Sequence, residues 1–218
     1  MEKKTSRGYL ITHEVFNAVT HGLALVLAVI GSILLIIKGM SNHSTIETIS
    51  FAIYGVSLSL LFLFSTLAHS LHFTRAKKVF QVFDHNGIFL LIAGTYTPYC
   101  LVAIGGWLGW SLLIIIWICA ICGIVFTSIF LPRLNRVPRF STVLFIVMGW
   151  MIMLAIYPLW KALPHAGFWL LVAGGVVYSL GAIIYRYKFP FAHLIWHFFV
   201  MVAAFFMWLS IYGYVGGK

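Results

Sequence analysis

The sequence predicts an all-α integral membrane protein, a bundle of seven transmembrane helices. Of its 218 residues, 62% are hydrophobic and 8% are charged, which leaves too little polar surface for a water-soluble domain of this size. Seven apolar segments follow one another with short connections, and each approaches or exceeds the roughly 20 residues that a transmembrane helix needs. The chain has no room for an additional soluble domain, so we expect residues 1–218 to form a single transmembrane domain.

Polar or basic connectors bound the first three expected helices, which span residues 16–37, 49–71 and 83–104. The first helix follows a basic tail, and the polar stretch 39–43 separates it from the second. The basic stretch 74–78 separates the second helix from the third. No short apolar core with a small-residue cleavage site follows the tail, so we expect the first helix to be retained rather than removed as a signal peptide.

The remaining four expected helices span residues 107–130, 142–159, 167–185 and 192–214. Gly105 and Gly106 make a tight turn before the first of them. The connectors between the others contain proline and charged residues, and they lie at 132–139, 161–165 and 186–190. Such connectors interrupt helices, although a sequence pattern places each boundary only to within about two to four residues.

Basic residues are concentrated on alternate connectors, which predicts the orientation of the chain in the membrane. One side holds Lys3, Lys4, Arg7, Arg75, Lys77, Lys78, Arg133, Arg136, Arg139, Arg186 and Lys188. The other side holds only Lys38, Lys161 and Lys218. By the positive-inside rule, we expect the N-terminus in the cytoplasm and the C-terminus outside.

The same distribution explains the net charge of +10 without nucleic acid. A nucleic-acid-binding surface usually has a continuous stripe or arm of basic residues, and this sequence has none. Their place beside the membrane suits anionic lipid headgroups instead. Membrane lipids are therefore the expected partners, no nucleic acid is expected to bind, and the sequence indicates no protein partner.

Two histidines, His193 and His197, lie four residues apart at the start of the last apolar segment. In a helix this spacing puts both imidazoles on one face, one turn apart. Polar rings among apolar residues have two explanations: each ring is hydrogen-bonded to a neighbouring helix, or both bind a metal ion. The pair alone does not decide between these explanations.

The depth of other polar residues favours a metal ion. In the expected orientation, four helices place polar or ionisable side chains in one layer near the cytoplasmic side. These residues are Glu14, Asn17, His21, Ser65, His69, Asp84, His85, Asn86, His193 and His197. The outer halves of the same helices carry almost nothing comparable, whereas unrelated core histidines would not be sorted by depth.

Three imidazoles in this layer form a natural ligand set for zinc. His69, His193 and His197 would bind the ion and leave a fourth position open to water. Ser65 lies one helical turn before His69 on the same face. Its hydroxyl could hydrogen-bond that water or a substrate carbonyl, or it could bond back to the helix backbone.

A carboxylate is needed near a doubly charged ion in a poorly hydrated layer, and the chain has four acidic residues. Glu2 lies in the tail and Glu47 is expected in an outer connector, which leaves Asp84 and Glu14. We interpret Asp84 as the group that orients or deprotonates a zinc-bound water.

Glu14, Asn17 and His21 occupy one face of the first helix. We interpret them as partners of the metal ligands or as a polar contact between helices, with His85 as a possible partner of Glu14. His72 is expected at the membrane interface. The histidines without an expected role are His13, His43 and His165.

Four spaced motifs together resemble one known family: Glu14-x2-Asn17-x3-His21, Ser65-x3-His69, Asp84-His85-Asn86-Gly87-Ile88 and His193-x3-His197. The combination is similar to the progestin and adipoQ receptor family, and most of all to its short bacterial branch, hemolysin III. The resemblance covers nearly the whole chain. It implies seven helices with a cytoplasmic N-terminus, zinc held by His69, His193 and His197, and Asp84 contacting the zinc through water.

The resemblance also implies a function and a location. The family lies beside the alkaline ceramidases, whose similar His, Asp and Ser motifs suggest a zinc-dependent hydrolase of a lipid-like amide or ester, active in membrane lipid homeostasis. The bacterial name implies a different function, a membrane-lysing or pore-forming protein. A third possibility is a membrane sensor in which zinc is structural. We expect a multi-pass protein of the bacterial plasma membrane.

Overall fold

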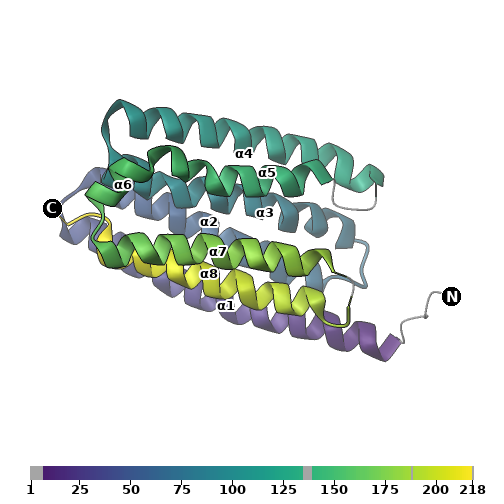
Figure 1. Cartoon of the computed structure of the whole chain (residues 1–218). Helices are drawn as coiled ribbons and strands as arrows, with labels where there is room; N and C mark the ends of the chain where they lie inside the picture. Colours follow the sequence, from purple (N-terminus) through teal and green to yellow (C-terminus); the bar gives the residue numbers. More distant parts are fainter. Residues whose placement is uncertain (1–6, 135–138, 188, 218) are drawn as a thin grey trace.

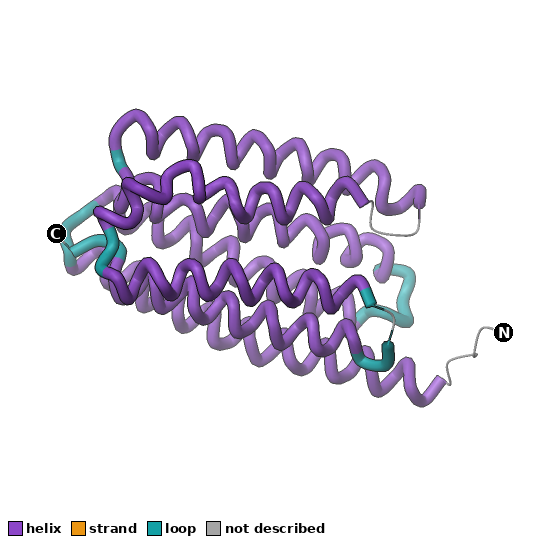
Figure 2. The backbone as a smooth tube through the Cα atoms, in the orientation of Figure 1, coloured by secondary structure: helices purple, strands orange, loops and turns teal. Residues whose placement is uncertain are grey.

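The computed structural model describes residues 7–134, 139–187 and 189–217, with the side chains of Leu134 and Arg139 left aside. These residues form helices and loops, and they contain no strand (Figure 2). Seven helices or interrupted helices are long and apolar enough to cross a membrane. The predicted all-α, seven-helix transmembrane fold is therefore confirmed.

The first three spans extend beyond the apolar segments that predicted them. Helix α1 covers Arg7–Ser41, α2 covers Thr45–Ser70 and α3 covers Lys77–Pro98. The π-helical turn η1, Tyr99–Ile104, completes the third span. Helix α1 begins well before residue 16 because hydropathy detects only the part of a helix that needs hydrocarbon, and polar turns can continue it into the interface.

The expected connector position of Glu47 was wrong, because this residue lies in the first turn of α2 and is buried. Ser44 caps the helix by accepting a hydrogen bond from the Glu47 backbone nitrogen at 3.3 Å. The Glu47 carboxylate accepts from Asn42 Nδ2 at 2.7 Å and from the Gly217 backbone nitrogen at 3.0 Å. Ser-x-x-Glu is the sequence signature of a helix N-terminus, and it marks this helix start correctly.

The fourth span begins at the end of the bundle opposite the start of α1, where it follows the third span, and the fifth span ends there. Helix α4 covers Gly106–Leu134 and follows a reversal at Gly105 and Gly106, where φ is +64° and +56°. Glycine adopts such angles without a steric penalty. The fifth span consists of α5 (Arg139–Trp150), the 3₁₀ turn η2 (Met151–Ala155) and α6 (Ile156–Ala162).

The break in the fifth span is held by Tyr96 of α3. The Tyr96 hydroxyl donates to the Met148 carbonyl at 2.6 Å and accepts from the Ile152 backbone nitrogen at 2.6 Å. Interrupting a helix inside a membrane leaves backbone groups without partners, and another element must satisfy them. Hydropathy predicts a single helix over 142–159, because a break of this kind does not change how apolar the segment is.

The last two spans are α7 (His165–Arg186) and α8 (Ala192–Tyr214). Helix α8 packs against both α7 and α1, so the first and last helices of the chain are neighbours (Figure 1). Polar contacts also join α1 to α8 and to the residue that follows it. Trp208 Nε1 donates to the Gly31 carbonyl at 3.0 Å, and Lys38 Nζ donates to the carbonyls of Tyr212 and Val215 at 2.6 and 2.7 Å.

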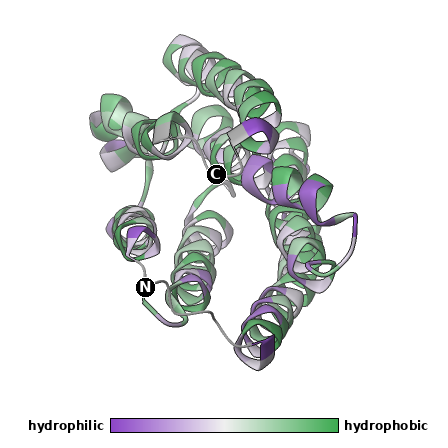
Figure 3. Cartoon of the chain, turned by 90° about the vertical axis from the view of Figure 1, so that its right-hand side faces the viewer, coloured by the Kyte–Doolittle hydropathy of each residue, from purple (hydrophilic) through white to green (hydrophobic). Residues whose placement is uncertain are grey.

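Apolar side chains cover much of the outside of the bundle, as a lipid environment requires. Leu23 and Leu27 of α1 are 62% and 66% exposed, for example. Figure 3 shows the bundle from the end at which α1 begins, with hydrophilic residues at the helix ends and hydrophobic residues along the rest. We call this end the N-terminal end of the bundle.

Most of the described basic residues lie at one end of the bundle, as the alternation of basic connectors predicted. Arg7, Arg75, Lys77, Lys78, Arg133 and Arg186 belong to the N-terminal end of the bundle, and Lys38 and Lys161 belong to the opposite end. Lys3, Lys4, Arg136, Lys188 and Lys218, which also entered the orientation argument, lie outside the described residues. The two ends of the chain lie at opposite ends of the bundle (Figure 1). A cytoplasmic N-terminus stays a prediction.

Candidate metal centre

Three histidines from two helices meet at the N-terminal end of the bundle. His69 comes from the last turn of α2, and His193 and His197 come from the first turns of α8. One nitrogen atom of each ring lies within 4.8 Å of a nitrogen of the others. His197 is almost fully buried, and the other two are partly buried.

The spacing of these nitrogens suits zinc. Nε2 of His69 lies 3.2 Å from Nε2 of His193. Two imidazole nitrogens bound to one tetrahedral zinc, at the usual Zn–N distance of about 2.0–2.1 Å, lie roughly 3.3 Å apart. His69 and His193 therefore have the separation of two ligands of one metal ion, and a nitrogen of His197 lies within 4.8 Å of both.

The start of α8 is held in place by α1. Phe191 precedes the helix with a left-handed backbone, at φ +60° and ψ +14°, which is uncommon for a bulky residue. Its backbone nitrogen donates to the Tyr9 hydroxyl at 3.1 Å, and the two rings lie 5.1 Å apart. This contact offsets the strain and positions His193, two residues further on.

A carboxylate from α1 orients His69. Nδ1 of His69 lies 2.7 Å from Oε2 of the buried Glu14. Because a carboxylate accepts hydrogen bonds, the proton of the ring is placed on Nδ1 and the lone pair on Nε2. Metal-binding histidines commonly donate their second N–H to a carboxylate in this way.

Thr20 of α1 lies beside His197 in a similar way. Its hydroxyl is bonded to the carbonyls of Phe16 and Asn17 at 2.9 and 3.0 Å, and it lies 3.4 Å from Nδ1 of His197. A hydroxyl that donates to a carbonyl is left to accept from the ring, which again leaves Nε2 with its lone pair. The sequence motifs give Thr20 no role, because a threonine that bonds its own helix leaves no signal in the sequence.

His21 lies flat against His197. The ring centroids are 3.5 Å apart with 13° between the planes, and the edge of the Phe62 ring lies against His21 on another side, at 5.1 Å. Both ring nitrogens of His21 are buried and have no hydrogen-bond partner among the described residues. With Glu14 and Asn17, it forms a buried face of α1 that borders the three histidines.

His13 and His72 were not expected at the site, yet both lie beside Glu14. Nδ1 of His72 is 3.2 Å from Glu14 Oε2, and Nδ1 of His13 is 3.6 Å from Oε1. Lys77 Nζ donates to Nε2 of His72 at 2.9 Å, which requires a neutral ring. Burial lowers the pKa of His72 below its usual value, against the opposing effect of the Glu14 carboxylate.

The expectation that His85 pairs with Glu14 was wrong. His85 Nδ1 instead lies 2.8 Å from the carbonyl oxygen of Gln81, one turn earlier in α3. Glu14 has His69, His72 and His13 as its described partners. A sequence pattern places residues at the same depth but does not show which of them face one another.

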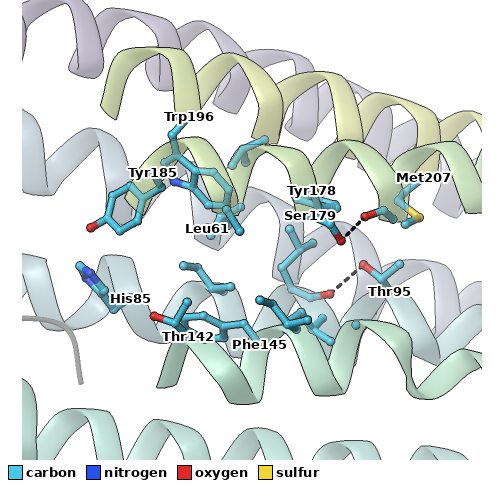
Figure 4. Close-up of a pocket in the computed structure, with 18 of the residues that line it drawn as sticks. Leu61, His85, Thr95, Thr142, Phe145, Tyr178, Ser179, Tyr185, Trp196 and Met207 are labelled. Carbon is cyan, nitrogen blue, oxygen red and sulfur yellow. Dashed lines mark hydrogen bonds between the residues drawn. The ribbon is translucent and has the colours of Figure 1, made fainter. Parts of the chain in front are cut away.

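A cavity of about 180 Å³ runs from this cluster into the bundle. Figure 4 shows His85, Tyr185 and Trp196 at one end, and Thr95, Ser179 and Met207 at the other. Besides His85, the polar lining includes His21, Ser65, Asp84, His193 and His197. Asp84 and Ser65, the residues expected to handle water and substrate, thus line the same cavity as two of the candidate metal ligands.

Comparisons with known proteins agree on one family. The family model described as "Haemolysin-III related" matches residues 9–208. Hemolysin-3 of Bacillus cereus is 45% identical over 215 residues, which is 98% of this chain and 97% of that protein. The Hemolysin-3 homolog of Bacillus subtilis (strain 168) is 43% identical over 194 residues, 88% and 90% of the two chains. The human monocyte to macrophage differentiation factor is 29% identical over 206 residues, 91% and 83% of the two chains.

Proposed function

The chain belongs to the haemolysin-III related family, and from this premise we propose that it is a zinc-dependent hydrolase of a lipid-like amide or ester. As a multi-pass integral membrane protein with bacterial relatives, it would act in the bacterial cell membrane on membrane lipids. The observation that supports this function best is that two of the three clustered histidines, His193 and His197, line one largely apolar cavity together with an aspartate and a serine.

The number of histidines favours catalysis over a purely structural metal. His69, His193 and His197 would hold the zinc, and the described residues supply no fourth ligand to this cluster. Structural zinc sites usually have four protein ligands, whereas catalytic sites have three and leave one position open. When bound there, zinc would polarise a carbonyl group and make water more acidic.

Asp84 and Ser65 would handle the reacting groups. Asp84 would orient or deprotonate the attacking water, and Ser65 would hydrogen-bond the carbonyl oxygen of the substrate. Ser65 is 1% exposed and lies one turn before His69 on the same face of α2, which puts it one turn further into the bundle. Both side chains reach the cavity without being needed as metal ligands.

The rest of the cavity suits a hydrocarbon chain. Away from the histidines its wall is formed mostly by apolar and aromatic side chains, including Ile88, Leu91, Phe145 and Met207. If the hydrocarbon chain of a lipid lay along this wall, the amide or ester bond at the end of that chain would lie near Asp84. This arrangement supports a lipid amide or ester rather than a water-soluble substrate.

The test combines metal analysis with one conservative substitution. Purified Asp84→Asn protein should keep its zinc and thermal stability and lose hydrolysis of a long-chain amide by about 100-fold or more, since general acid–base groups contribute this much. Lipid extracts of cells carrying the variant should accumulate the uncleaved lipid. Wild-type protein that holds zinc but cleaves no lipid amide or ester would contradict the proposal and favour a structural metal.

Membrane lysis is the second candidate, supported by the name of the two Bacillus relatives. A pore-forming protein does not need the Asp84 carboxylate, so its lytic activity should follow insertion and expression. Lysis that is unchanged in Asp84→Asn, together with an unchanged lipid composition, would favour this function.

A further inference from the structure

His85 is a buried histidine for which the proposed reaction has no role so far. It is 9% exposed and lies on α3, directly after Asp84. It lines the same cavity as Asp84 and His193. Figure 4 shows it at the same end of the cavity as Tyr185 and Trp196.

The contact with Gln81 fixes the tautomer of the ring. A carbonyl oxygen only accepts hydrogen bonds, so Nδ1 of His85 carries the proton in the 2.8 Å contact with the Gln81 carbonyl. In the neutral ring, Nε2 then has the lone pair and can take up a proton. A backbone carbonyl commonly orients a functional histidine in this way.

Hydrolysis of an amide needs a group of this kind. The amine is a poor leaving group unless its nitrogen gains a proton as the C–N bond breaks. Asp84, in the proposed reaction, serves the attacking water rather than the leaving nitrogen. The described cavity also contains Tyr185 at this end, but a neutral phenol has no basic nitrogen that could accept a proton and pass it on.

We propose that His85 relays a proton from Asp84 to the leaving atom of the substrate; this rests on the proposed hydrolase function. In the first step the water oxygen bonds to the carbonyl carbon and Asp84 accepts the water proton. Asp84 then passes this proton to Nε2 of His85. Finally the C–N bond breaks and the proton moves from Nε2 to the nitrogen. Asp84 ends ionised and His85 neutral, as they began, and the products are a carboxylic acid and an amine.

The test compares two substrates that differ in their leaving group. The palmitoyl amide of a simple alkyl amine requires protonation of its nitrogen. Palmitoyl p-nitrophenyl ester releases a weakly basic phenolate and does not. The variant is His85→Asn, because the asparagine amide can still donate to the Gln81 carbonyl but has no equivalent of Nε2. The matched control is His165→Asn, at the opposite end of the bundle and exposed.

For His85→Asn, we expect kcat on the amide to fall by about 100-fold or more, with KM unchanged. Hydrolysis of the ester should fall far less, and zinc content and thermal stability should match those of His165→Asn. An equal loss on both substrates would contradict the relay and leave the hydrolase standing. Wild-type protein that cleaves neither substrate would contradict both.

A second measurement does not depend on turnover. Nitrogen-15 NMR of histidine-labelled protein distinguishes a ring protonated at Nδ1 from one protonated at Nε2. The signal that disappears in His85→Asn should be that of a neutral ring with its proton on Nδ1. A signal from the other tautomer would overturn the relay, because Nε2 would then have no lone pair to receive a proton.

Discussion

A 2.7 Å hydrogen bond joins Nδ1 of His69 on α2 to Oε2 of Glu14 on α1. Through this bond α1 orients a residue of the candidate metal site, although α1 contributes none of its three histidines. Glu14 also contacts His72 and His13, so one buried carboxylate organises three imidazoles at the N-terminal end of the bundle. The sequence motifs predicted Asp84 as the carboxylate beside the candidate metal site. In the structure the carboxylate that is hydrogen-bonded to a candidate ligand is Glu14.

The first prediction concerns this carboxylate. Glu14→Gln keeps the size of the side chain but removes its charge, so it should weaken zinc binding by roughly 10–100-fold, as losses of such partners of ligating histidines commonly do. Competition with a chelator measures the affinity. An unchanged affinity in correctly folded Glu14→Gln protein would show that His69 does not need this contact.

The second prediction concerns the ligands themselves. Wild-type protein should contain about one zinc per chain, and His193→Ala or His197→Ala should lose most of it. Both variants should also melt at lower temperature, because metal binding contributes to folding. His43→Ala, in the loop between α1 and α2, is the matched control. Full zinc content in both ligand variants would contradict the assignment.

The third prediction concerns orientation. A cysteine at Arg75, in the loop between α2 and α3, should react with a membrane-impermeant thiol reagent only from the cytoplasmic side. A cysteine at Ser41, at the end of α1, should react only from outside. The unmodified chain, with its own three cysteines, gives the background. The reverse labelling would place the metal cluster at the outer face.

The fourth prediction concerns His21, whose flat ring covers His197. His21→Phe keeps a stacked ring and removes two buried nitrogens without partners, so unfolding free energy should stay the same or rise, since such groups cost about 1–3 kcal/mol. His21→Ala should instead lower it by roughly 2–5 kcal/mol, as a buried large-to-small change does. Loss of zinc in the phenylalanine variant, but not of folding, would identify His21 as a ligand.

The seven-helix fold could be predicted because each helix that crosses the lipid must be apolar over most of its length, which the sequence shows directly. The interruption of the fifth span could not, because it depends on a hydroxyl from another helix. Tyr96 is far from Met148 in the sequence, and no sequence pattern near residue 150 indicates that the two residues are hydrogen-bonded.

The candidate site was predictable to a similar depth. Helical spacing placed His193 and His197 on one face, and sorting by depth brought His69 to the same layer. Neither argument gives the rotation of one helix against another, and rotation decides which residues touch. For this reason the sequence did not show that His85 is turned away from Glu14, with its Nδ1 beside the Gln81 carbonyl of its own helix. Nor did it show that Thr20 lies beside His197 and that His72 lies beside Glu14.

The neighbouring positions of α1 and α8 also bear on the order in which the protein is made. Glu14 leaves the ribosome well before His197, and five spans lie between their helices in the sequence. Since α8 supplies two of the three clustered imidazoles, the complete set exists only after the final helix has docked against the first. A metal ion bound by all three therefore marks a chain in which α8 has been made and inserted, whereas a chain stalled or truncated before α8 contributes only His69.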